Sequence, residues 1–100
     1  MYINKRWNFI VKRYTYPAVL YFDGETYMLA MHDLRLVTSG SKVEEVYEDM
    51  LTYMEGYFQC ALAIDEIVEK PSDFAAVAKS KTKNVVLLVS VKVKDDKTVE

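Results

Sequence analysis

The sequence predicts an α+β domain in which a small, mostly antiparallel sheet packs on one long helix and one short helix. Three observations predict this class. Two apolar runs flank the dipeptide Asp23-Gly24, which is typical of a β-hairpin. Apolar residues recur at helical spacing between positions 43 and 62. A valine-rich run at residues 85–93 alternates between two faces, as a strand does.

Length and composition fit one globular domain. The chain has 100 residues, of which 51% are hydrophobic and 28% charged. Its formal net charge of −2 gives no overall attraction to nucleic acid or to acidic membranes. No apolar run reaches the roughly 18 residues needed to span a bilayer, and the N-terminal residues do not read as a signal peptide. The single cysteine, Cys60, favours a reducing compartment, so we expect a cytoplasmic protein.

The domain is expected to comprise residues 14–94. Residues 1–13 mix polar, basic and aromatic side chains and are read as an N-terminal extension, either an arm or an extra edge strand. Residues 95–100 are polar and are read as a tail.

The hairpin is expected to join strands at 14–22 and 25–32 through a two-residue turn, because Asp and Gly tolerate positive φ. Pro17 cannot donate to a ladder, so it predicts a sheet edge or a bulge. Both faces of the hairpin are apolar. Either helices cover both faces, or a second copy or partner covers one of them. The pairs expected from this turn are Phe22 with Glu25, Leu20 with Tyr27, Ala18 with Leu29 and Tyr16 with Met31.

A short strand at about residues 36–39 is expected to end at Gly40. Ser41 and Glu44 then form a capping-box pattern at the start of the long helix. Gly56 weakens that helix, which suggests that another backbone approaches it closely. The expected apolar stripe of the helix consists of residues 43, 46, 47, 50, 51, 54, 57, 58, 61 and 62.

A linker at 69–73 is expected to lead into a short helix with the sequence "FAAVAKS". Ser72 or Asp73 can cap this helix. In the last strand, the odd-numbered residues from Val85 to Val93 share one face, and the second half of the other face is polar.

The residues that could have a catalytic or metal-binding role are better explained by structural roles. His32 beside Asp33 lacks a nucleophile and an orienting group, so we read it as exposed or hydrogen-bonded. Cys60 reads as a small core residue, because nothing near it in sequence would activate the thiol. No cysteines or histidines show zinc-ligand spacing, and no glycine-rich phosphate loop is present. Asp23, Glu25 and Asp33 could together bind a metal, but surface acids in turns are commoner.

The order of motifs resembles the HicB-like antitoxins of bacterial and archaeal HicA–HicB toxin–antitoxin systems. The segments that carry the resemblance cover about four fifths of the chain. They are "YPAVLYF" (16–22), "DGETYMLAMHDL" (23–34), "LVTSGSKVEEVYEDMLTYMEGYF" (36–58) and "EKPSDFAAVAKSKTKNVVLLVSVKV" (69–93).

The resemblance implies a partial ribonuclease-H-like fold and a binding function, because family members cap a small RNA-cleaving toxin and block its active site. After Asp33-Leu34 the family usually has Pro-Gly, whereas this chain continues "RLVT" and is one residue shorter. The family's C-terminal DNA-binding segment has no counterpart here, so we do not expect direct DNA binding. Ribonuclease-H catalysis is not expected either, because the first strand has no acidic residue in its interior.

We therefore expect a non-enzymatic, antitoxin-like protein without cofactor or metal, which forms a homodimer or a higher homo-oligomer and holds a small basic HicA-like toxin. One alternative is an orphan homo-oligomeric member of the family. Another is a small nucleic-acid-binding regulatory domain that uses Lys79, Lys81 and Lys83. The residues expected to contact a partner, from the exposed ends of the hairpin, are Tyr21, Asp23, Asp33 and Arg35.

Overall fold

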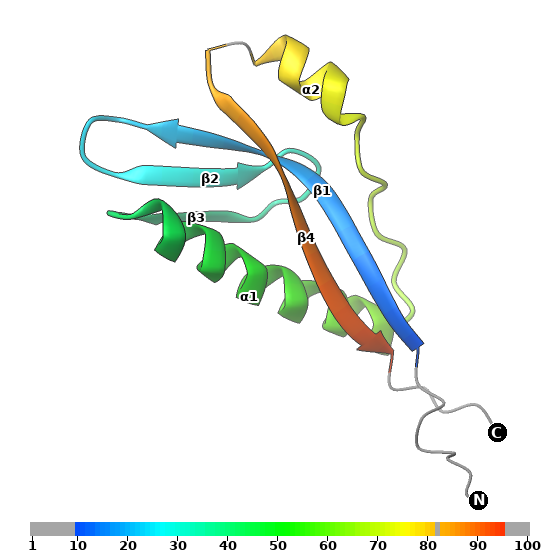
Figure 1. Ribbon diagram of the computed structural model, residues 1–100. Coiled ribbons are helices and arrows are strands. Elements are labelled where there is room, and N and C mark those ends of the chain that lie inside the picture. The colour runs from blue at the N-terminus through cyan, green and yellow to red at the C-terminus, as the bar shows by residue number, and fades with distance from the viewer. Residues whose placement is uncertain (1–9, 82, 96–100) are drawn as a thin grey trace, which may run out of the picture.

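The computed structural model describes residues 10–81 and 83–95. Four strands form one antiparallel sheet in the order β3-β2-β1-β4, and two helices flank it (Figure 1). This architecture confirms the α+β class. In chain order the elements are β1 (Ile10–Phe22), β2 (Tyr27–Met31), β3 (Val37–Gly40), α1 (Val43–Ala63), α2 (Phe74–Ser80) and β4 (Val85–Asp95).

The first strand organises the sheet. β1 pairs with β4 from Ile10, opposite Asp95, to Leu20, opposite Val85. Only its second half, from Ala18 onward, also pairs with β2. Residues 10–13, which the sequence assigned to an N-terminal extension, therefore continue β1. The rest of that extension, residues 1–9, lies outside the described residues.

The hairpin register differs from the two-residue turn expected from the sequence. Phe22 pairs with Tyr27, so the loop contains four residues, 23–26, and every expected pair moves by two positions. The Asp23 carboxylate explains the longer loop, because it accepts hydrogen bonds from the backbone N–H groups of Glu25 (3.0 Å) and Thr26 (2.7 Å). A shift of two residues keeps each side chain on its expected face.

Pro17 lies at a local sheet edge, as expected. Its carbonyl accepts a hydrogen bond from the His32 N–H (3.0 Å), just past the end of β2. In a strand the N–H and C=O of one residue point to the same side, so the nitrogen of Pro17 also faces this side rather than β4. The missing N–H therefore costs the β1–β4 ladder nothing.

The capping box expected for α1 does not form. The helix starts at Val43, its N-cap is Lys42, and no side chain caps it. Gly40, at the end of β3, lies close to this helix start. A Cβ built there would lie 3.2 Å from Cγ2 of the buried Val46. The end of β3 thus runs close against the first turn of α1. Gly56 is exposed and has open space around it, so the close backbone approach expected there is wrong.

The hydrophobic core lies between α1 and one face of the sheet. α1 packs across β4, β3 and β2. The Phe58 ring stacks on the Tyr14 ring with centroids 3.9 Å apart, which joins α1 to β1 as well. The expected apolar stripe is confirmed, since all its members are buried or half-buried except Val43. The buried core consists of Tyr16, Ala18, Leu29, Met31, Leu34, Val46, Met50, Met54, Phe58, Val89 and Val93.

The second face of the sheet is covered in part by the short helix. Figure 1 shows α1 and α2 on opposite sides of the β1–β4 pair. α2 contacts β4 and β1, and Val77 of α2 is buried, as are Pro17 and Val19, two of the β1 residues on this face. Asp73 is the N-cap of α2 and accepts from the Ala76 N–H at 3.0 Å, as expected. The chain thus supplies part of the cover that its two-sided apolar hairpin requires.

Candidate interaction surfaces

The four residues expected to contact a partner lie at two separate places. Tyr21 and Asp23 lie at the β1–β2 loop, whereas Asp33 and Arg35 lie in the loop between β2 and β3, at the other end of the hairpin. Tyr21, Asp23 and Arg35 are exposed. The structure therefore does not bring these residues into a single site.

Asp23 maintains the loop as well as facing solvent. The backbone hydrogen bonds from Thr26 and Glu25 lower the pKa of its carboxyl group, because they stabilise the charged form. Gly24 in the same loop has φ +98°, a conformation that strongly favours glycine. The tip of the hairpin is thus a defined turn that presents a charged carboxylate.

The carboxylate of Asp33 is hydrogen-bonded within the chain. Its carboxylate accepts hydrogen bonds from the N–H and the hydroxyl of Ser72, in the linker between α1 and α2. The Tyr16 hydroxyl donates to the Glu69 carbonyl in the same linker. Burial raises the pKa of Tyr16, with further contributions from Tyr57 and Asp33. These contacts bind the linker to the edge of β1 that β2 leaves open.

An apolar patch remains uncovered on the second face of the sheet. It consists of Tyr21, Met28 and Val37, which are 36%, 43% and 53% exposed. The register makes them neighbours, because Tyr21 lies opposite Met28 and Val37 lies opposite Ala30, two residues along β2. We call these three residues the hairpin patch. Sequence alternation predicts that Tyr21 and Met28 share one face of the hairpin, but only the strand register adds Val37, and only the position of α2 shows that this part of the face stays open.

The solvent face of α1 is acidic. Its exposed carboxylates are Glu44, Glu45, Glu48, Asp49 and Glu55. Glu44 and Glu45 lie in the first turn, where the helix dipole stabilises negative charge. Tyr53 lies on the same helix and is 52% exposed. This side of the molecule suits a basic partner better than an acidic one.

The lysine run extends from α2 to the start of β4. Lys79 and Lys83 are exposed and Lys81 is half-buried. Because Val85 pairs with Leu20, the residues just before β4 lie next to Tyr21. The structure thus places an exposed aromatic ring near the basic run, a proximity that the sequence alone did not show.

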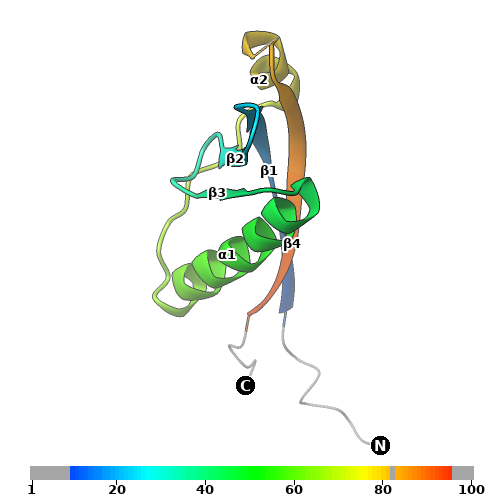
Figure 2. The ribbon, with the colours of Figure 1, turned by 90° about the vertical axis from the view of Figure 1, so that its left-hand side faces the viewer.

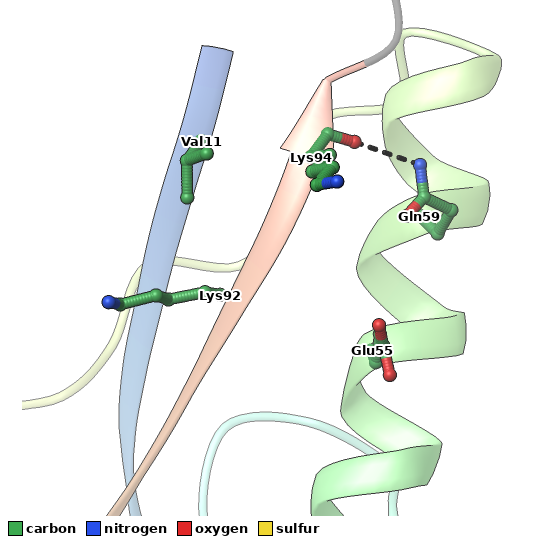
Figure 3. A pocket seen from close by; sticks show the side chains of 5 residues that line it. All are labelled: Val11, Glu55, Gln59, Lys92 and Lys94. Atoms are coloured by element: carbon green, nitrogen blue, oxygen red, sulfur yellow. Dashed lines mark hydrogen bonds between the residues drawn. The ribbon is translucent and has the colours of Figure 1, made fainter. Parts of the chain in front are cut away.

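A pocket of about 560 Å³ opens at the outer edge of β4 (Figure 3). Glu55 and Gln59 of α1 line it together with Lys92, Lys94 and Val11. The Gln59 side-chain amide donates to the Lys94 carbonyl at 2.9 Å. No sequence pattern predicts this pocket, because it depends on where α1 crosses β4.

The residues considered for chemistry are not assembled into a reactive site. His32 and Cys60 are both exposed, so the core position expected for Cys60 is wrong. Asp33 lies at the opposite end of the hairpin from Asp23 and Glu25. Among the described residues, no group of three His, Cys, Asp or Glu side chains could hold a metal ion. Neither described helix is long and apolar enough to cross a membrane.

No family model, curated protein or solved structure matches this chain.

Proposed function

We propose that this chain is a non-enzymatic, HicB-like antitoxin that caps a small, basic, HicA-type RNA-cleaving toxin. The observation that carries the proposal is the hairpin patch, an apolar surface that α2 leaves open beside the charged hairpin tip. Exposed apolar patches rimmed by polar residues are typical of protein-binding sites. On this proposal the fold is a partial ribonuclease-H-like scaffold in the cytoplasm.

The negative charge of the chain also favours a small basic partner. The chain has a pI of about 5.4, and the solvent face of α1 carries five exposed carboxylates. Opposite net charges speed the encounter between two proteins. The hairpin patch would then supply the contact that excludes water once the partners have met.

The test is capture followed by an activity assay. The tagged chain and its Met28→Glu variant are used to capture proteins from the native host, and each captured protein is purified and incubated with RNA. We expect a small basic protein that binds the tagged chain, binds the variant at least 10-fold more weakly, and cleaves RNA until an equimolar amount of the chain is added. A captured protein without ribonuclease activity, or one whose activity the chain leaves unchanged, would contradict the proposal.

A second candidate function is nucleic-acid binding through Lys79, Lys81 and Lys83. The proximity of Tyr21 to this run favours it, because bases stack on exposed aromatic rings beside basic residues. Binding to a single-stranded RNA would then fall with rising salt and be lost when the three lysines are changed to serine. Lack of RNA binding at low salt would exclude this function.

A further inference from the structure

The outer edge of β4 is open. No strand pairs with this edge in the part of the chain that the structure describes, and Figure 2 shows β4 at the side of the sheet. β4 has 11 residues, contains no proline, and pairs with β1 without a bulge. Proline and bulges are two of the devices by which edge strands avoid pairing with other chains, and both are absent here.

The ladder shows which backbone groups face outward. The carbonyl of Pro17 is bonded to His32 on the side away from β4, so Pro17 and its partner Leu88 are not hydrogen-bonded to each other. Residues alternate along an antiparallel pair, so Leu88 and the other even-numbered residues of β4 point their N–H and C=O groups outward. The hydrogen bond from Gln59 to the Lys94 carbonyl agrees with this assignment and occupies one end of the edge.

Two exposed apolar side chains lie along the open edge of β4. Val85 and Leu88 are 59% and 49% exposed, and they project from opposite faces of β4. A strand added at this edge would cover both of them, whereas a partner on one face would cover only one. The lysines of β4, Lys92 and Lys94, are confined to its C-terminal end.

We propose that the open edge of β4 pairs with β4 of a second copy, antiparallel and centred on Leu88, to form one sheet that continues through both copies. This register places outward-facing residues opposite one another. Leu88 meets its own counterpart and Val86 meets Ser90, whereas Val85 meets Val91 as a pair whose backbone groups face β1. No lysine of β4 lies opposite another lysine, because the pairing ends where Val91 meets Val85, the first residue of β4.

The pocket beside β4 provides charge complementarity for this register. Lys83 lies in the turn just before β4, so Lys83 of the second copy comes close to the end of the paired strands, where its Val85 meets Val91. Glu55 and Gln59 project from α1 into the pocket at this place (Figure 3). A lysine ammonium can therefore reach a carboxylate and an amide oxygen at each end of the paired strands.

The inference deepens the self-association expected of the proposed antitoxin, but its test requires no toxin. The full chain and two variants are compared by sedimentation equilibrium. Leu88→Glu places two like charges opposite each other at the centre of the interface. Met28→Glu is the matched control, since Met28 lies on the same face with similar exposure but on β2, away from the edge.

We expect the unmodified chain and Met28→Glu to have the mass of two chains, and Leu88→Glu the mass of one. Circular dichroism verifies that each variant is folded. A monomeric unmodified chain, or a Leu88→Glu variant that dimerises as tightly as the unmodified chain, would overturn the proposal. Because Met28→Glu tests toxin capture and Leu88→Glu tests dimerisation, either function can fail without the other.

A charge exchange tests the register. Glu55→Lys should weaken the dimer at least 10-fold, and adding Lys83→Glu to the same chain should restore most of the affinity. If the double variant dimerises no better than Glu55→Lys alone, the register centred on Leu88 is wrong.

Discussion

The carboxylate of Asp33 accepts two hydrogen bonds from Ser72, one from the backbone N–H at 2.8 Å and one from the hydroxyl at 2.5 Å. The two residues are 39 positions apart and both are half-buried. The contact joins the loop after β2 to the linker between the helices. It therefore fixes the path by which the chain passes from the α1 side of the sheet to the α2 side.

Replacing Asp33 with alanine should destabilise the protein. Hydrogen bonds to a charged group contribute about 1.5–3 kcal/mol, and the Ser72 N–H would lose its carboxylate acceptor. We expect the free energy of unfolding, measured by urea denaturation, to fall by about 2 kcal/mol. Arg35→Ala is the control, since Arg35 is exposed in the same loop. Equal stability of the two variants would show that the linker is held by other contacts.

Tyr16→Phe should weaken the fold and change its response to alkaline pH. The variant loses the hydrogen bond to the Glu69 carbonyl, at a cost of about 1 kcal/mol. Burial raises the pKa of Tyr16 in the folded state above the ordinary value of 10.0. The stabilisation is therefore complete below pH 10.0 and is lost as the pH rises through the folded-state pKa. The difference in unfolding free energy between the two proteins should shrink in this range, and a constant difference would exclude this linkage.

Replacing Gly56 and Gly40 with alanine should have opposite effects on the stability of the fold. Gly56 is exposed in the middle of α1 with open space around it, so Gly56→Ala should raise the free energy of unfolding by about 1 kcal/mol. Gly40→Ala should lower it, because the new Cβ would press on the buried Val46. Thermal unfolding of both variants tests this. A destabilised Gly56→Ala variant would indicate a contact on the exposed face of α1.

Lys92→Glu should stabilise the sheet. Arg13 lies directly opposite Lys92 on the same face of the β1–β4 pair, and like charges opposite each other are destabilising. The substitution creates an opposite-charge pair, for an expected gain of about 0.5 kcal/mol at low salt. The gain should disappear in an Arg13→Ala background. If it persists there, its cause lies elsewhere than in this pair.

The elements defined by local rules could be predicted from the sequence. The apolar stripe of α1 identifies the buried residues Met50, Met54 and Phe58, because one helix face must meet the sheet. Asp73 was one of the two caps expected for α2, and Val89 and Val93 are buried on the expected face of β4. These features depend only on periodicity and on side chains within one turn of each other.

The features that depend on distant contacts could not be predicted. The four-residue loop follows from the Asp23 carboxylate, whose choice of backbone partners no periodic pattern encodes. The hydrogen bonds between Asp33 and Ser72 join residues 39 positions apart, a contact that no local sequence pattern encodes. Cys60 lies just outside the buried stripe, at a position where a small change in helix rotation decides between core and solvent. The open edge of β4 depends on the strand order, which sequence periodicity leaves undetermined.

The pairing of β1 with β4 also has a consequence for how the protein folds. Ile10 lies opposite Asp95, so β1 leaves the ribosome well before its partner β4 has been synthesised. Contacts between residues so far apart in sequence slow folding, because a long loop must close before they form. Until β4 is synthesised and brings Val89 and Val93 into the core, part of the apolar face of α1 stays exposed. The domain is therefore expected to fold late and all at once, after a period in which the nascent chain exposes β1 to chaperones.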